Sequence, residues 1–197
     1  MVTIPEDELQ AIGVIGRGWK VVELGNKKNA TGCYREWYVA QGCDYECIDW
    51  NAEDGAIFAD LGAAFPGHLI ERVGGADLVT NFGCMEHVLT DQVQGWLNVA
   101  MLSAKVGCRL AMVMPAPGHW EHHGVYQPSL KWYERWANMN GYGGRIWYNE
   151  KRTRHTIVCS LERHEPFEIE TYYQPPSDWV HITPKAKRVN PLEKKHG

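Results

Sequence analysis

The sequence predicts an α/β fold: a doubly wound, mostly parallel seven-stranded sheet with helices on both faces and a C-terminal antiparallel hairpin. The first observation is that short apolar runs alternate with longer helical patterns along most of the 197 residues. Strand, helix and strand in that order require a crossover connection, and crossovers give parallel pairing. The second observation is that two neighbouring apolar runs late in the chain are joined only by a short basic segment, which is typical of a hairpin.

The expected elements follow this pattern in chain order. Parallel strands are expected at Lys20–Leu24, Tyr45–Ile48, Leu78–Asn81 and Arg109–Met114. Helices are expected at Thr31–Gln41, Gln92–Ala104 and Ser129–Asn140. The two runs of the hairpin are Arg145–Tyr148 and Thr156–Leu161.

The expected helix Ser129–Asn140 carries an aromatic stripe. Serine suits its start, and Gly141 suits its end. Trp132, Tyr133 and Trp136 recur at helical spacing, which predicts a face packed against the sheet. An aromatic cage around a cationic ligand is the alternative interpretation.

The length fits one domain, which we expect at residues 1–163. A chain of 197 residues can bury roughly two thirds of its unfolded surface around a single core. Beyond Arg163, proline, aromatic and charged residues alternate without a clear period. We therefore expect residues 164–197 to form an extended arm, ordered in part by its aromatic side chains.

The charge balance argues against a nucleic-acid-binding protein. The formal net charge is -4 and the isoelectric point is about 6.1, whereas phosphate contacts require a dense basic face. Residues 1–144 carry 10 Lys and Arg against 17 Asp and Glu, and residues 145–197 carry 10 against 7. A weakly basic C-terminal part of this kind is typical of a solvated surface.

Cysteine usage and the N-terminus indicate the compartment. The six cysteines are scattered and form no Cys-x-x-Cys pair, so neither a zinc ribbon nor a disulfide framework is indicated. The first segment, MVTIPEDELQ, is acidic, whereas a signal peptide needs a basic start and an apolar core. No apolar run approaches the ~20 residues that span a membrane. We therefore expect a cytoplasmic location.

Polar residues follow the expected strands at the edge where a doubly wound sheet binds ligands, the carboxyl ends of its strands. Glu23 and Gly25 end the first strand, and Asp49 ends the second, 24 residues after Gly25. A carboxylate at this place typically takes both hydroxyls of a ribose. The alternative is that Asp49 only caps the turn that follows it.

As an ordered series, these strand ends resemble those of class I S-adenosylmethionine-dependent methyltransferases. The matching segments are VVELG, CIDWN, FADLG, ADLVTNFGCMEHV and GCRLAMVMP. In addition, VYQPSLKWYERWANMNGY resembles the helix that precedes the final hairpin in small-molecule members, so the similarity runs from Gly18 to Leu161. The resemblance implies a Rossmann-like fold and S-adenosylmethionine as the cofactor.

The resemblance also implies a cofactor site, residue by residue. The implied positions are Glu23, Gly25 and Asn26 around the methionine part, Asp49 and Trp50 at the ribose, Asp60 and Leu61 against the adenine, and Asn81, Phe82 and Gly83 beneath the sulfonium. Asp60 would accept a hydrogen bond from the adenine amino group.

The loop after the first strand departs from the family pattern, in which Gly-x-Gly usually follows the acid. This chain has Gly25-Asn26-Lys27. Asparagine tolerates positive φ better than branched residues, so we expect Asn26 or Asn29 to stand in for a glycine. The Gly-x-Gly-x-x-Gly fingerprint of a dinucleotide site is absent, which argues against an NAD-dependent oxidoreductase.

Glu86 and His87 are implied at the border between cofactor and acceptor, at the start of an expected helix, MEHVLTDQV. A histidine there suits a general base, because its unperturbed pKa of about 6.5 allows proton transfer at neutral pH. Alternatively, both are polar residues of a first helical turn that hold the loop.

The segment after Arg109–Met114, PAPGHWEHHGVYQP, contains His119, His122 and His123. We expect it to roof the acceptor pocket, with one of these histidines contacting the acceptor or acting as a base. Zinc or iron binding by these histidines and Glu121 is the alternative. The His-x-x-His-His spacing is no standard zinc signature, and proline and glycine leave no helix to fix ligands, so we expect no metal.

Together these features predict methyl transfer to oxygen, nitrogen or carbon of a small-molecule, sugar or lipid-linked acceptor. The Asn/Asp-Pro-Pro-Tyr/Phe stretch of amino-directed DNA methyltransferases is absent, since Asn81-Phe82-Gly83-Cys84 stands at that position. The alternative is a non-catalytic binding or structural protein that keeps the fold with a degenerate cofactor loop.

Overall fold

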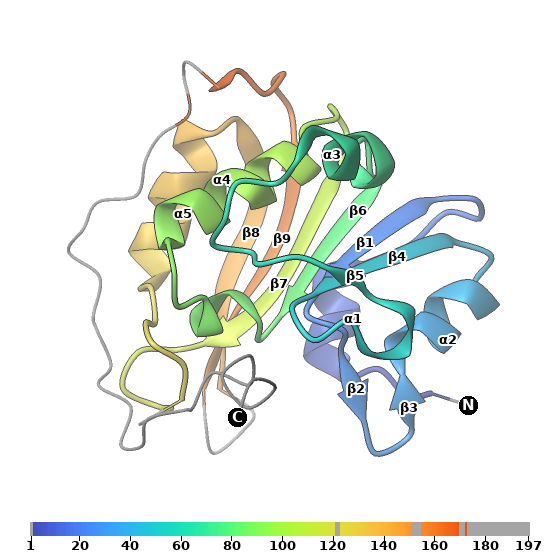
Figure 1. Cartoon of the computed structure of the whole chain (residues 1–197). Coiled ribbons are helices and arrows are strands. Elements are labelled where there is room, and N and C mark those ends of the chain that lie inside the picture. Colours follow the sequence, from blue (N-terminus) through green and yellow to red (C-terminus); the bar gives the residue numbers. More distant parts are fainter. Residues whose placement is uncertain (1, 121–122, 151–154, 170–171, 173–197) are drawn as a thin grey trace, which may run out of the picture.

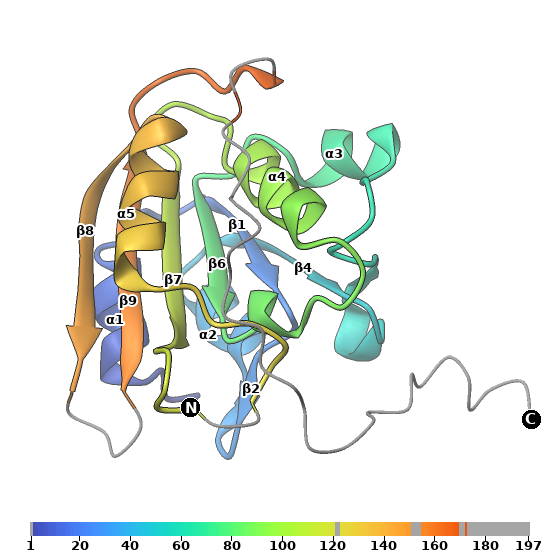
Figure 2. The same cartoon turned by 90° about the vertical axis from the view of Figure 1, so that its left-hand side faces the viewer.

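One seven-stranded sheet forms the centre of the computed structural model, with helices on both faces (Figures 1 and 2). The structure describes residues 2–120, 123–150, 155–169 and 172. The strands in chain order are β1 (Lys20–Leu24), β4 (Asp44–Asp49), β5 (Ile57–Phe58), β6 (Leu78–Phe82), β7 (Arg109–Pro115), β8 (Tyr142–Asn149) and β9 (Thr156–Arg163). The predicted fold class is confirmed.

The order of the strands across the sheet is β5-β4-β1-β6-β7-β9-β8. The five strands from β5 to β7 are parallel, and β1 lies at the centre, where Val21 is opposite Tyr45 on one side and Leu78 on the other. Strand β9 pairs antiparallel with both β7 and β8. The C-terminal antiparallel pair is therefore present, although residues 151–154, which join its strands, lie outside the described residues.

Successive residues of a strand point to opposite faces of the sheet, so both faces carry apolar side chains. Helices cover each of these faces. In β1, Val22 and Leu24 belong to the larger core, whereas Val21 belongs to the smaller one. The larger core lies under α3 (Gly67–Val73), α4 (Gln92–Leu102) and α5 (Leu130–Met139). The smaller core lies under α1 (Glu6–Ile12) and α2 (Tyr34–Ala40), on the opposite face (Figures 1 and 2).

The aromatic stripe of α5 packs into the larger core, as predicted. Its ring contacts centre on Trp96 of α4, whose ring centroid lies 4.9 Å from Trp132, 5.9 Å from Tyr133 and 5.0 Å from Trp136. Ser129 caps α5, its hydroxyl accepting a hydrogen bond from the backbone N–H of Trp132 at 3.3 Å. These rings fill the interface of two helices, which supports the core interpretation over a cage.

The helix expected at Thr31–Gln41 begins later, at Tyr34. The residues before it form a two-stranded antiparallel ribbon of β2 (Lys28–Asn29) and β3 (Gly32–Cys33). The Asn29 side chain accepts a hydrogen bond from the backbone N–H of Thr31 at 2.8 Å, which closes the turn of this ribbon. Local hydrogen bonding by Asn29 and Thr31 therefore replaces the first helical turn.

MEHVLTDQV also differs from the expectation. Met85–His87 forms only a 3-10 turn, and α4 begins at Gln92. The carboxylate of Asp91 accepts hydrogen bonds from the backbone N–H groups of Val93 and Gln94, which places the helix start there. Glu86 consequently stands in a tight turn after β6 and not on a helix.

Part of the segment beyond Arg163 packs against the domain. Phe167 and Tyr172 contact the larger core, and the backbone N–H of His164 donates to the carbonyl of Gly141 at 2.9 Å. The remainder of the expected arm lies outside the described residues, so the boundary at 163 stays a prediction. Among the described residues, the helices are too short or too polar to cross a bilayer.

Candidate active site

The carboxyl ends of β1, β4 and β6 meet at one edge of the sheet, which brings together residues from three separate segments. Leu24 is opposite Ile48 on one side and Asn81 on the other. The residue that follows, Gly25, donates its backbone N–H to the carbonyl of Ile48 at 2.8 Å. The ends of these three strands, with Gly25, Asp49 and Asn81, therefore lie next to one another at one edge of the sheet.

Glu23 organises the loop after β1. Its side chain is fully buried, and its Oε1 accepts a hydrogen bond from the backbone N–H of Lys27. Burial raises the pKa of this carboxyl to about 8, and the Lys27 hydrogen bond opposes only part of that effect. The hydrogen bond between Lys27 and the buried Glu23 thus holds the loop after β1 in its conformation.

Gly25 provides the conformation that the turn needs. Its φ is +81°, and a Cβ at this position would lie 2.5 Å from Sγ of Cys84, in the segment after β6. The expectation that Asn26 or Asn29 adopts positive φ is wrong, because among the described non-glycine residues only Ala52 and Asp54 do so. A single glycine suffices here because the chain needs one sharp turn.

Asn26 contributes by hydrogen bonding. Its backbone N–H contacts Sγ of Cys47 at 3.1 Å, and its side-chain amide donates to the carbonyl of Glu53 at 3.0 Å. It therefore connects the loop after β1 to the segment after β4.

Lys27 is a site residue that the sequence interpretation missed. Its ammonium donates to the carbonyl of Phe82 at 2.8 Å, so the side chain crosses from the β1 loop to the end of β6. The available signal was its place in the loop, where a lysine stands instead of the usual second glycine. A positive charge consequently lies at the edge of the sheet where β1 and β6 end.

The segment after β4 presents Asp49 and Trp50. Asp49 is half-buried, and its Oδ1 accepts a hydrogen bond from the backbone N–H of Asn51 at 3.1 Å. The turn-capping role is therefore present, and it uses one of the two carboxylate oxygens. Trp50 is 43% exposed, which leaves its ring open to a ligand.

Asp60 and Leu61 follow β5. Oδ1 of Asp60 accepts hydrogen bonds from the backbone N–H of Gly62 at 2.8 Å and from the hydroxyl of Thr90 at 3.2 Å, which links this loop to the segment before α4. Leu61 is buried, and its carbonyl accepts a hydrogen bond from the Asn98 amide at 2.8 Å. The loop is thus held on both sides, with Asp60 itself exposed.

The exit of β6 is shaped by Asn81. Its Oδ1 accepts hydrogen bonds from the backbone N–H groups of Cys84 and Met85, both at 3.2 Å. Gly83 has a φ of +73°, and a Cβ there would lie 3.2 Å from Oε1 of Glu86. The turn therefore directs the Glu86 carboxylate back toward Gly83.

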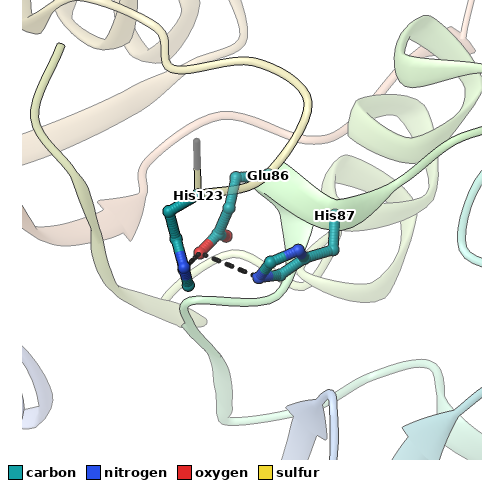
Figure 3. Close-up of side chains that lie close together, drawn as sticks. All are labelled: Glu86, His87 and His123. Carbon is teal, nitrogen blue, oxygen red and sulfur yellow. Dashed lines mark ion pairs between the residues drawn. The ribbon is translucent and has the colours of Figure 1, made fainter. Parts of the chain in front are cut away.

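Glu86, His87 and His123 form a cluster at this exit (Figure 3). Oε1 of Glu86 lies 3.7 Å from Nε2 of His87 and 3.4 Å from Nε2 of His123. The Glu86 side chain is 0% exposed, whereas the side chains of His87 and His123 are 30% and 35% exposed. Two half-exposed imidazoles therefore cover a buried carboxylate.

Of the two described histidines in the loop after β7, only His123 belongs to this cluster. His119 is exposed and stacks on His155, with ring centroids 3.9 Å apart. His122 lies outside the described residues. The amide of Gln127 donates to the carbonyl of His123 at 3.1 Å and fixes the backbone beside the cluster.

No protein-family model matches the chain, and no curated protein matches it. The structure is similar to 1,6-didemethyltoxoflavin-N1-methyltransferase from Burkholderia thailandensis, solved with 1,6-didemethyltoxoflavin and S-adenosylhomocysteine, at a TM-score of 0.51 and 11% identity over 76% of this chain and 72% of that chain. It is also similar to phosphoethanolamine N-methyltransferase 2 from Haemonchus contortus, in complex with phosphomonomethylethanolamine and S-adenosylhomocysteine. The TM-score is 0.57, and the identity is 11% over 80% of this chain and 52% of that chain.

A third similar structure is an O-methyltransferase family protein from Burkholderia thailandensis, at a TM-score of 0.50 and 16% identity over 76% of this chain and 52% of that chain. This chain thus spans about half the length of two of these three proteins. Identities at this level define the fold. The chain has the Rossmann-like α/β fold of the class I S-adenosylmethionine-dependent methyltransferases.

Proposed function

We propose that this protein is an S-adenosylmethionine-dependent methyltransferase that acts on a small-molecule, sugar or lipid-linked acceptor. The observation that carries the proposal is the convergence of Gly25, Asp49 and Asn81 at adjacent strand ends of a methyltransferase fold. Ligands of doubly wound sheets bind at this edge.

In the proposed cofactor site, each strand end contributes one contact. The carboxylate of Asp49 binds the ribose hydroxyls through the oxygen that does not cap the turn, and Trp50 lies beside it. Asp60 and Leu61 lie against the adenine, and Asn81 shapes the floor formed by Phe82 and Gly83.

Lys27 extends this site at its methionine end. One N–H of its ammonium is used by the carbonyl of Phe82, and an ammonium has three donors. The remaining donors are suited to the carboxylate of the methionine part, because an ammonium–carboxylate hydrogen bond is stronger than a neutral one. The charge of the lysine thereby provides the contact to the cofactor that a second glycine would provide by allowing the backbone to approach closely.

The acceptor is proposed to lie against Glu86, His87 and His123, next to the sulfonium. Methyl transfer to an already nucleophilic atom requires alignment above all, and a histidine in contact can take the proton that a hydroxyl or amine acceptor loses. His119 is left out of this proposal, because its ring stacks on His155 and it is not part of the cluster around Glu86.

Thermal unfolding with S-adenosylmethionine or S-adenosylhomocysteine tests the proposal. Binding of either ligand raises the melting temperature. With Asp49→Ala, about tenfold more ligand should be needed for the same rise in melting temperature, as expected for a lost charged hydrogen bond. Asp44→Ala, at the opposite end of β4, should not. If both ligands leave the wild-type transition unchanged, the methyltransferase proposal fails; if Asp49→Ala binds normally, the ribose placement fails.

The second candidate is a binding protein that holds the cofactor without catalysis. The feature that favours it is Lys27, which stands in place of the second glycine and whose side chain extends to the carbonyl of Phe82. The two candidates differ in turnover: this one predicts that S-adenosylhomocysteine binds, but that no methyl group is transferred across a panel of hydroxyl, amine and carbon acceptors.

A further inference from the structure

The cluster at the exit of β6 has a donor set that the proposed methyl transfer does not by itself require. Glu86, His87 and His123 each present one oxygen or nitrogen atom, and these atoms all lie within 4.8 Å of one another. Two histidines and one carboxylate are the ligand set of many catalytic zinc sites and of non-haem iron sites.

Two of the three separations within the cluster are close to those of metal ligands, and the third is within 4.8 Å. Four ligands placed tetrahedrally about 2.1 Å from an ion are separated from one another by about 3.4 Å. Oε1 of Glu86 lies 3.4 Å from Nε2 of His123 and 3.7 Å from Nε2 of His87. An ion can therefore be placed between these atoms with only small side-chain adjustments.

The Glu86 carboxylate is the second, independent observation. It is fully buried, and neither of its oxygens has a hydrogen-bond partner within the described residues. A buried carboxylate without hydrogen bonds is costly, and its negative charge requires compensation. Its Oε1 points toward the nitrogen atoms of both histidines (Figure 3), so a cation at their meeting point would supply that compensation.

The surrounding backbone holds the three ligands in place. The carbonyl of Glu86 accepts a hydrogen bond from the backbone N–H of Val125 at 2.7 Å, which fixes the His123 loop to the turn that bears Glu86 and His87. Gly124 has a φ of +75°, and a Cβ there would lie 2.7 Å from the carbonyl oxygen of Glu86. The close approach of the two segments thus depends on a glycine beside a ligand.

We propose that Glu86, His87 and His123 bind a divalent transition-metal ion, with Zn²⁺ as the best match to this donor set. No metal was expected from the sequence, because the spacing of the histidines within residues 119–123 matches no standard zinc signature. The ligands instead come from two segments, and His87 and His123 are 36 residues apart. Short-range spacing cannot reveal such a site.

The consequence for function rests on the proposed methyltransferase activity. Three protein ligands leave at least one coordination position open, and the half-exposed histidines place that position toward solvent. An oxygen or nitrogen atom of the acceptor would occupy it, and the bound ion would then take over from a free histidine the role of promoting loss of the acceptor's proton. The expected substrates are therefore acceptors in which a metal-coordinating oxygen or nitrogen atom lies next to the atom that receives the methyl group.

Titration calorimetry of the chelator-stripped full chain with ZnCl₂ tests the site directly, without any assay of activity. We expect one high-affinity ion per chain. Glu86→Gln and His123→Ala should each weaken Zn²⁺ binding by about 100-fold or more, since even loss of an outer-sphere partner of a metal ligand costs about 10-fold to 100-fold. His119→Ala is the matched control, because His119 lies in the same loop but stacks on His155.

Two results would overturn the inference. One is a wild-type chain that takes up neither Zn²⁺ nor Co²⁺; the other is equal Zn²⁺ affinity in Glu86→Gln, His123→Ala and the wild type, which would place the ion elsewhere. Folding of each variant is checked by its thermal transition. S-adenosylhomocysteine binding is measured separately, so that cofactor binding without metal refutes only the metal site, and metal binding without cofactor refutes only the methyltransferase proposal.

Discussion

The backbone N–H of Val125 donates a hydrogen bond to the carbonyl of Glu86 at 2.7 Å. This bond joins the loop after β7 to the turn after β6, two segments that are distant in sequence. It places His123 over the buried Glu86 carboxylate. The candidate site on the acceptor side therefore depends on one backbone contact and on the small residue next to it.

Substitution of that small residue should separate the two segments. Gly124→Ala introduces a Cβ 2.7 Å from the Glu86 carbonyl at a positive φ, so we expect a loss of about 2 kcal/mol in the free energy of unfolding and weaker Zn²⁺ binding. Gly118→Ala is the control, because Gly118 has a φ of +80° but no atom of the described residues within 4 Å of its Cβ position. Urea unfolding and calorimetry measure both. Equal Zn²⁺ affinity in the two variants would show that the Gly124 contact does not position His123.

Lys27→Met should weaken S-adenosylhomocysteine binding by about 10-fold to 150-fold, because a charged hydrogen bond to the cofactor carboxylate contributes about 1.5–3 kcal/mol. Lys28→Met provides the matched control, since the neighbouring Lys28 pairs with Glu53 and Asp54 at the surface. Calorimetry at constant ionic strength gives the two affinities. Tighter binding by Lys27→Met would mean that the lysine obstructs the proposed cofactor site.

Glu23 should make stability depend on pH. Burial raises its pKa from the ordinary value of 4.5 to about 8, so between these values the folded chain keeps a proton that the unfolded chain has released. The free energy of unfolding contributed by this group therefore falls by about 1.4 kcal/mol per pH unit as the pH rises through that window, and levels off above it.

Glu23→Gln cannot lose this proton, and its side-chain oxygen can still accept from the Lys27 N–H. We expect urea unfolding of this variant to show a flatter pH profile than that of the wild type, with the difference growing toward pH 8. Glu162→Gln, an exposed position on β9, should leave the profile unchanged. Parallel profiles for Glu23→Gln and the wild type would contradict the raised pKa.

Arg163 should be the most sensitive charged residue of the C-terminal strands. Its buried guanidinium donates to the carbonyls of Ser103 at 2.6 Å and Ala100 at 3.2 Å, near the end of α4, and of Asn140 at 2.8 Å, at the end of α5. The partial negative charge of two helix ends is thus neutralised by one cation.

Arg163→Met leaves these carbonyls without their donor, so we expect a loss of about 3 kcal/mol in the free energy of unfolding. Arg145→Met, on the exposed face of β8, should change stability by no more than about 0.5 kcal/mol. Denaturant titration distinguishes the two. A loss for Arg163→Met as small as that of the control would show that its hydrogen bonds contribute little.

The sequence by itself determined the fold class and the edge of the sheet at which a site can form. Runs such as Val21–Leu24 are buried because alternate residues of a central strand pack into the cores on opposite faces of the sheet. A short stretch of sequence is enough to show this pattern. The strand-end positions of Gly25, Asp49 and Asn81 follow from the same pattern. The Asn29 turn moved the start of the helix expected at Thr31–Gln41, and the Asp91 cap starts α4 at Gln92, as expected for Gln92–Ala104, so that MEHVLTDQV is not one helix; side-chain hydrogen bonds override helical periodicity at element ends.

Only the tertiary structure decided which polar side chains meet. Lys27 reaches Phe82 across adjacent strands, and His123, not His119, lies against Glu86. Both contacts join segments that are far apart in the chain, and their geometry depends on loop backbones fixed by glycines and by long-range hydrogen bonds. Local sequence patterns carry no information about such approaches, because they arise only after the strands have paired and the loops have packed on one another.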